Sequence, residues 1–219
     1  MFRETQGGRG RGSWAVVVGS AGGAGREIAL RLAEDGYSVV VCGRDGASAR
    51  ETRQLIEWVG GRAVDVVADL ADSAAVDRLV IEVFRLLVGE PLEVLVNVAG
   101  EADYGLPEDA FDTAFDLIVK TPFLLTGAFA PVMAERGRGA VVNVGGLDGM
   151  AGLGNAVRAA VAALDSLIRL WAAEYGPRGV RINSVDLDGG GESDAIAEAV
   201  RFLVSPHAAY VQGSVSTMS

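Results

Sequence analysis

Short runs rich in β-branched residues alternate along this chain with stretches of helical spacing, and this alternation restricts the possible folds more than any other feature. Each predicted strand is followed by an amphipathic segment in which apolar residues recur with a helical period. Strand-helix-strand units of this kind join parallel strands through right-handed crossovers. The sequence therefore predicts an α/β fold in which a doubly wound parallel sheet lies between two helical layers. The predicted strands are 14–18, 38–42, 63–67, 92–96, 140–144 and 180–185.

The length and net charge of the chain limit its domain organisation and the kinds of partner that it can bind. The 219 residues carry a formal net charge of −10, which repels phosphate backbones and argues against nucleic acid as a partner. We expect residues 14–219 to form a single domain and residues 1–13, rich in Gly and Arg and without the apolar segment of a signal peptide, to form a flexible tail. The longest uncharged apolar stretch, 121–134, is shorter than the about 18 to 20 residues of a membrane span, so we expect a buried helix and no membrane partner.

The single cysteine gives an indication of the cellular compartment. Cys42 lies in a Val-rich run and has no second cysteine to pair with in the chain. An unpaired cysteine fits a reducing environment, which favours a cytoplasmic protein, and its simplest role is that of a small core residue.

Ligands of doubly wound sheets bind beyond the carboxyl ends of the strands, so we expect the binding residues in the loops at that edge. The first of them is glycine-rich and lies between the first strand and a helix expected to begin near Arg26. Glycines allow a tight turn and let backbone N–H groups approach a pyrophosphate at the positive end of the helix. The alternative is a tight turn without a ligand. The candidate phosphate-binding residues are Gly19, Ser20, Gly23, Ala24 and Gly25.

Two charged residues follow the next strands. Arg44 stands about 20 residues after the glycine turn, where an acidic residue would hold the ribose hydroxyls of NAD. A guanidinium group there favours the 2′-phosphate of NADP; the alternative is an exposed arginine paired with Asp45. Asp69 is placed to accept a hydrogen bond from the adenine amino group or to cap the helix expected to begin near Ser73, and the two uses are compatible.

Four motifs occur along the chain in the same order as the landmarks of the short-chain dehydrogenase/reductase family, and the resemblance extends over nearly the whole chain, from Trp14 to Gly213. The resemblance implies a Rossmann-type three-layer domain that binds NAD(P), and dimers or tetramers joined through the two long helices after the fourth and fifth strands. Leu70, Asn97, Ala99 and Gly100 become further cofactor-binding candidates on this basis. The motifs are the glycine turn, Asp69-Leu70, Asn97-Val98-Ala99-Gly100 and Asn143-Val144-Gly145-Gly146.

The family performs its chemistry with a Tyr that protonates the carbonyl, a Lys that lowers the pKa of that Tyr, a Ser that orients the substrate and an Asn that holds a water. The resemblance places Val157, Val161, Gly146 and Ile118 at these four positions. None of these side chains transfers a proton, so the chain resembles a divergent member that lacks the Asn-Ser-Tyr-Lys tetrad. Loss of general acid catalysis costs about 10²- to 10⁴-fold in rate, so ordinary carbonyl reduction is expected to be very slow.

No other residue of the expected types replaces the tetrad. Lys120, the only lysine, is expected to be a solvated helix residue. Tyr175 lies 18 residues beyond Val157 on the same predicted helix, which corresponds to about 27 Å. His207 follows the last helix and is expected to be structural or exposed.

The segment after the sixth strand also departs from the family. Relatives continue there with a Pro-Gly turn and a long excursion over the substrate, whereas residues 186–192 lead directly into a helix expected near Ser193. We therefore expect most of the substrate lid to be missing, with the pocket more open than in relatives.

Acidic and phenolic side chains gather at the strand ends and supply candidate catalytic groups. The carboxyl of Asp148, two residues beyond Gly146, would have a raised pKa if it faced an apolar pocket, as a general acid or base requires. Tyr104 would donate to a developing oxyanion, with Asp103 beside it. The alternative for each is a surface or turn-forming residue. Other residues at this edge are Glu101, Asn155, Asp186 and Asp188.

Three functions follow from these observations. The first is a non-redox acid/base enzyme, such as an isomerase, cyclase or dehydratase, acting on a small apolar carbonyl metabolite of polyketide type through Asp148, Tyr104 and Asp103. The second is a catalytically silent protein that binds a dinucleotide or a partner through the apolar helices 111–135 and 155–175. The third is an NADPH-dependent reductase with a relocated acid. No metal site is expected.

Overall fold

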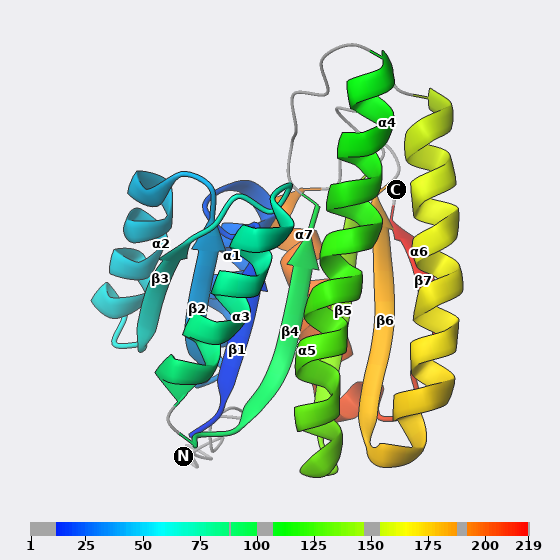
Figure 1. Cartoon of the computed structure of the whole chain (residues 1–219). Coiled ribbons are helices and arrows are strands. Elements are labelled where there is room, and N and C mark those ends of the chain that lie inside the picture. The colour runs from blue at the N-terminus through cyan, green and yellow to red at the C-terminus, as the bar shows by residue number, and fades with distance from the viewer. Residues whose placement is uncertain (1–11, 88, 100–106, 147–153, 188–191, 219) are drawn as a thin grey trace.

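Seven parallel strands form one sheet in the order β3-β2-β1-β4-β5-β6-β7 (Figure 1). The computed structural model describes residues 12–87, 89–99, 107–146, 154–187 and 192–218. The chain turns from one half of the sheet to the other between β3 and β4, so that β4 pairs with β1. The predicted doubly wound α/β fold is confirmed. The strands are β1 Trp14–Val18, β2 Ser38–Gly43, β3 Ala63–Val67, β4 Leu92–Val98, β5 Gly139–Gly146, β6 Val180–Leu187 and β7 Val215–Met218.

Helices cover both faces of the sheet. One face is covered by α1 (Gly23–Glu34), α2 (Gly46–Trp58) and α7 (Ser193–Val204). The opposite face, nearer the viewer in Figure 1, is covered by α3 (Ser73–Leu87), by the continuous helix formed from α4 (Pro107–Phe115), a π-helical turn (Asp116–Lys120) and α5 (Thr121–Glu135), and by α6 (Gly154–Tyr175). The result is the predicted three-layer arrangement.

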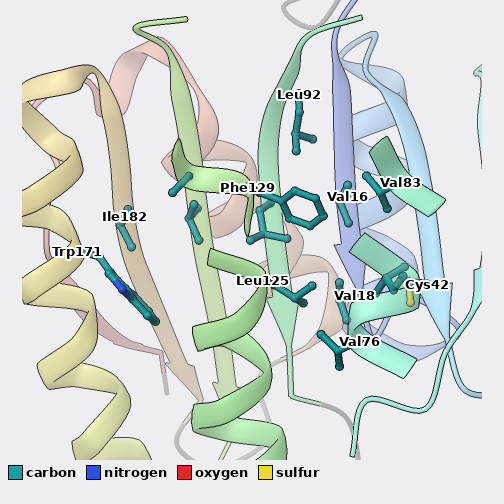
Figure 2. Packing of buried hydrophobic residues seen from close by; sticks show 14 of the residues in the cluster. Val16, Val18, Cys42, Val76, Val83, Leu92, Leu125, Phe129, Trp171 and Ile182 are labelled. Carbon is teal, nitrogen blue, oxygen red and sulfur yellow. The ribbon is translucent and has the colours of Figure 1, made fainter. Parts of the chain in front are cut away.

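The central strands are apolar throughout because helices bury both of their faces. In β1, Val16 and Val18 pack toward α3 and α5, while Ala15 and Val17 pack toward α1. Figure 2 shows the first of these two cores, in which Phe129 of α5 lies beside the strands. Each fully buried side chain of this size contributes about 1.5 to 3 kcal/mol, which explains why the β-branched runs dictate the sheet.

The predicted strand positions are close to those observed. The first and third strands have the predicted bounds, and the other four extend by one to three residues. The seventh strand was indicated only by the family resemblance. It is a four-residue edge strand in which Ser216 and Thr217 interrupt any apolar run. The first helix begins at Gly23, three residues before its expected start near Arg26.

The segment Phe111–Glu135 is the only described helix long and apolar enough, by length and composition, to cross a membrane. Its residues Leu125, Phe129 and Met133 are fully buried against the sheet. A core helix passes the same test of composition, and this packing agrees with the buried helix expected at 121–134.

The start of the domain needs one correction. Ser13, which the sequence analysis assigned to the tail, is buried, and its hydroxyl donates a hydrogen bond of 2.8 Å to Glu93. The ordered domain therefore includes Ser13. Residues 1–11 lie outside the described residues, so the flexible tail remains a prediction.

Candidate functional site

The glycine turn between β1 and α1 closes on itself through two of its glycines. Gly19 has a φ of +81°, and a Cβ there would lie 2.4 Å from the carbonyl oxygen of Val98. A Cβ on Gly25 would lie 2.1 Å from the carbonyl oxygen of Gly19. Larger residues at these two positions would push the turn away from β4 and from α1.

The middle of the same turn is open. A Cβ on Gly22 or Gly23 would meet nothing within 4 Å, and no side chain caps the N-terminus of α1 at Gly22. The first N–H groups of a helix have no partner within the helix, and the helix dipole makes this end positive. The turn therefore presents an uncovered backbone site suited to a pyrophosphate, as predicted for Gly23 and its neighbours.

Two other predicted residues of the turn have different placements. The hydroxyl of Ser20 is buried, donates to the carbonyl of Val17 at 2.7 Å and accepts from the N–H of Cys42 at 2.9 Å. It therefore ties β1 to β2, and the N–H of Ser20 is also engaged, since it donates to the Cys42 carbonyl at 2.9 Å. Ala24 is partly buried in the first turn of α1.

Arg44 and Asp69 lie together in a shallow groove beside β3 and α3. Both are exposed. The suggested pair of Arg44 with Asp45 is not formed among the described residues, because Asp45 accepts from the N–H groups of Ala47 and Ser48 and caps α2. Hydrogen bonds to the charged form hold the pKa of this carboxyl below its ordinary value.

The capping role suggested for Asp69 also needs correction. Its carboxyl accepts from the N–H of Ala71 at 3.2 Å, in the turn before α3. Asp72, immediately before the helix, accepts from the N–H of Ala74 at 2.9 Å and so caps α3 instead. Asp69 and Asp72 both lie within four residues before Ser73, and only the backbone conformation decides which of them caps the helix.

A second, mostly apolar pocket opens at the carboxyl ends of β4, β5 and β6, beside the glycine turn. Ile118 of the π-helical turn and Val161 and Leu164 of α6 form one wall. The predicted cofactor residues Leu70, Asn97 and Ala99 also line it, whereas Gly100 lies outside the described residues.

Two asparagines supply polar atoms to this pocket. The Asn97 Nδ2 donates to the Asn143 Oδ1 at 2.9 Å, which links β4 to β5. Among the described residues, the Asn97 Oδ1 and the Asn143 Nδ2 have no partner, although both atoms are buried. An unpaired buried polar group costs about 1 to 3 kcal/mol, so a polar ligand group or a water at this wall would be stabilised.

Of the residues at the four predicted tetrad positions, two line this pocket. Val161 and Ile118 line it, Val157 lies one turn earlier on α6 with 1% of its surface exposed, and Gly146 belongs to the end of β5. No Tyr or Lys is among the described residues of the lining.

The side chains considered as replacements lie elsewhere, as expected. Lys120 is exposed and forms an ion pair of 3.0 Å with Asp116, one helical turn away. Tyr175 ends α6 and is buried there, and His207 is exposed in the short helix Pro206–Ala208.

Asp186 is the acidic residue that the structure places in the pocket wall. It belongs to β6, and its Oδ1 accepts a hydrogen bond of 2.9 Å from the Ser184 hydroxyl. Burial is the main cause that raises the pKa of Asp186, and the Asp165 carboxyl raises it further against the hydrogen bond from Ser184. From the sequence, Asp186 was only one acid among several at this edge. The available signal was its spacing from Ile182 on the same strand, because residues an even number apart in a strand face the same side of the sheet.

Other predicted catalytic residues cannot be placed. Asp103, Tyr104 and Asp148 lie outside the described residues, as do Glu101 and Asp188, so their roles stay predictions. The segment between β6 and α7 spans only residues 188–192, consistent in length with the short connection expected there.

Comparisons with known proteins agree on one family. The sequence model of the family described as short chain dehydrogenase matches residues 13–195. An uncharacterized oxidoreductase of Thermotoga maritima is 30% identical over 90% of this chain and 78% of its own length. The (3R)-3-hydroxyacyl-CoA dehydrogenase of Mus musculus is 29% identical over 93% of each chain. A metagenomic short-chain oxidoreductase solved in complex with NADP shares 29% identity and a TM-score of 0.84, over 96% of this chain and 99% of the other.

These relatives overturn the leading functional prediction. The chain was expected to be a non-redox isomerase, cyclase or dehydratase acting on a polyketide-type metabolite, but the similar proteins are named as dehydrogenases and oxidoreductases. The error came from reasoning that a chain predicted to lack one set of proton-transfer residues must also have lost the reaction class. The NADP complex of a similar structure, together with the open glycine turn, supports binding of a nicotinamide dinucleotide. By the extent of the family match and the agreement of the fold, the chain belongs to the short chain dehydrogenase family.

Proposed function

We propose that the protein is an NAD(P)-dependent oxidoreductase that transfers a hydride between the nicotinamide and a small, largely apolar substrate. The observation that carries this proposal is the placement of the open glycine turn directly beside the apolar pocket, at one edge of the sheet. A dinucleotide bound with its pyrophosphate at Gly22 and Gly23 would reach that pocket with its other end. The bound nicotinamide supplies or accepts the hydride, and the chain orients the substrate and excludes water.

NADP is the proposed cofactor rather than NAD, on the strength of Arg44. Its side chain is exposed beside the groove that also contains Asp69, and the carboxyl of Asp45 is engaged in capping α2. A guanidinium group pairs well with a phosphate through two parallel N–H bonds.

The protein is also proposed to lack the proton-transfer tetrad of its relatives. The support is the apolar pocket wall that includes Ile118 and Val161, with Val157 buried beside it. Because a general acid contributes about 10²- to 10⁴-fold, unactivated ketones should react slowly unless another group supplies the proton.

Assembly and location complete the proposal. Residues 13–219 form a single domain that self-associates as a dimer or tetramer through α4, α5 and α6, where Phe123 and Leu170 are exposed apolar residues. Cys42 is buried and its burial raises the pKa of the thiol to about 12, so it is inert and the cytoplasm is the proposed location.

Thermal denaturation in the presence of NADPH, NADP, NADH and NAD tests the cofactor. The melting temperature should rise most with the two phosphorylated dinucleotides, because a ligand that binds only the folded state stabilises it. Arg44→Ala should remove this preference while leaving the melting temperature of the free protein unchanged. Absence of a shift with all four dinucleotides would contradict the proposed function.

A further inference from the structure

The described residues that line the pocket include no tyrosine, lysine or histidine to supply the proton that hydride transfer requires. A hydride added to a carbonyl carbon leaves negative charge on the oxygen, and this charge must be neutralised inside an apolar wall. Of the described residues that line the pocket, Asp186 alone carries a titratable side chain.

The position of Asp186 is fixed by the strand on which it lies. Alternate residues of β6 face the same side of the sheet, so Asp186 shares the face of Ile182, which packs against α5 and α6. Its neighbour across the sheet is Gly145 of β5, and a Cβ on Gly145 would lie 3.3 Å from the Asp186 Oδ1. The missing side chain at Gly145 therefore leaves room for this carboxyl at the end of β5.

The hydrogen bonds orient the carboxyl group. The Ser184 hydroxyl donates to the Asp186 Oδ1 at 2.9 Å and also approaches the Asn143 carbonyl at 3.1 Å. The described hydrogen bonds to this carboxyl involve Oδ1, which leaves Oδ2 as the oxygen that can present a proton to a substrate in the pocket.

The charges around Asp186 favour its protonated form. From α6, Asp165 is the described titratable group that acts on it, and Arg169 on the same helix acts on Asp165. From β5 the facing residues are Asn143 and Gly145, and from β7 the paired residue is Thr217, none of which carries a charge. Burial and a like charge both raise the pKa of a carboxyl.

We infer that Asp186 is the proton-transferring residue of this pocket, in the role that relatives give to a tyrosine and a lysine on the helix that corresponds to α6. In the reducing direction the hydride forms a C–H bond at the carbonyl carbon, and the π electron pair of the C=O bond takes the proton of Asp186. The products are the alcohol, the Asp186 carboxylate and the oxidised nicotinamide. The carboxylate then takes up a proton from solvent before the next turnover, and the oxidising direction reverses each step. This inference rests on the proposed redox function.

Asp165 then acts as a positioning residue through its charge. Its Oδ1 is buried without a partner among the described residues, and burial raises the pKa of this carboxyl also. Removing its charge by Asp165→Asn should lower the pKa of Asp186 and shift the pH dependence without removing the proton donor.

The test compares Asp186→Asn, Asp165→Asn and the control Asp77→Asn, an exposed carboxyl on α3. The probes are NADPH as cofactor and 2,3-butanedione as an activated carbonyl compound, followed by NADPH absorbance. Asp186→Asn keeps an oxygen that accepts from Ser184, so it should fold and bind NADPH as the wild type does. Its rate of reduction should fall by about 100-fold or more. Asp165→Asn should move the alkaline decline in rate to lower pH, and Asp77→Asn should change nothing.

A second readout is independent of turnover. In protein labelled with ¹³C at the aspartate carboxyls, the signal that disappears in Asp186→Asn should titrate above the usual range of about 3.9 for aspartate. The role of Asp186 would be overturned if Asp186→Asn reduced the diketone as fast as the wild type. A titration of the Asp186 carboxyl at the ordinary value would overturn it as well. Wild-type protein that neither binds nor oxidises NADPH would instead refute the proposed function, and the inference with it.

Discussion

At the scale of single residues, the glycine turn contains positions where only glycine fits against the neighbouring backbone and a position where a side chain could be added without a clash. Gly22 has a φ of −167°, which any residue adopts, and a Cβ there would meet nothing within 4 Å. Asp is favoured at this N-terminal capping position and should change the stability of the helix by only a few tenths of a kcal/mol relative to Gly. A carboxylate there would repel a pyrophosphate. We expect Gly22→Asp to keep its melting temperature and to lose the stabilisation by NADPH.

Gly25→Ala is the matched control in the same turn. Its Cβ would lie 2.1 Å from the Gly19 carbonyl oxygen, so the helix and the turn must move apart and the free protein should melt at a lower temperature. If Gly22→Asp retained the NADPH-induced shift of the wild type, the pyrophosphate site would have to lie elsewhere.

The same turn shows what residue patterns reveal and what they leave out. The glycines and Arg44 were recognisable because their chemistry depends on residue type and order. The inward orientation of the Ser20 hydroxyl was not recognisable, because it depends on hydrogen bonds to Val17 in the preceding strand and to Cys42 in β2. The importance of Asp186 was also not apparent from the sequence, because it depends on the charge of Asp165 and on the absence of a side chain at Gly145.

At the scale of secondary-structure elements, α7 is held by an arginine from the neighbouring strand. Arg181 of β6 donates to the carbonyls of Leu203 and Val204 at the end of α7 and to the carbonyl of Ala208 just after it. The Leu203 and Val204 carbonyls lie in the last turn of α7 and have no partner within the helix, whereas the Ala208 carbonyl also accepts from the N–H of Val211 at 2.9 Å. Burial lowers the pKa of the guanidinium. We expect Arg181→Met to lower the free energy of unfolding by about 3 kcal/mol, because several buried carbonyls lose a charged donor.

Urea denaturation measures this loss, and an exposed arginine provides the comparison. Arg78 on α3 has 68% of its side chain exposed and pairs with Asp72 at 3.4 Å. Arg78→Met should change the free energy of unfolding by less than about 0.5 kcal/mol. Equal effects of the two substitutions would mean that Arg181 contributes no more than a surface charge.

The elements themselves were largely predictable, and their irregular parts were not. Strand positions followed from buried β-branched runs that helices cover on both faces. The π-helical turn Asp116–Lys120 was not foreseen, because one wider turn leaves the apolar content of the segment Phe111–Glu135 unchanged. It nevertheless bears on the site, since Ile118 within it forms part of the pocket wall.

At the scale of the whole molecule, the order of strands brings the two parts of the site together. The chain returns from β3 to pair β4 with β1, so the glycine turn after β1 meets the end of β4 at Val98, at the point where the strand order reverses. The fold was predictable from the alternation of strands and helices. The reaction class was predicted wrongly, because apolar residues at the expected catalytic positions do not by themselves reveal whether another group supplies the proton.

The assembly of the molecule gives the last prediction. On the outer surface of α5 and α6, Phe123 is 51% exposed, Leu170 is 65% exposed, and the ring of Phe123 lies 6.1 Å from that of Trp171. Exposed apolar side chains on neighbouring helices favour burial against another surface. We expect a dimer or tetramer in sedimentation velocity, and Leu170→Glu should dissociate it because a carboxylate would be buried without a partner. Trp58→Glu on α2, where the side chain is 85% exposed, should leave the assembly intact. A wild-type protein that sediments as a monomer at micromolar concentration would show that this face remains in water.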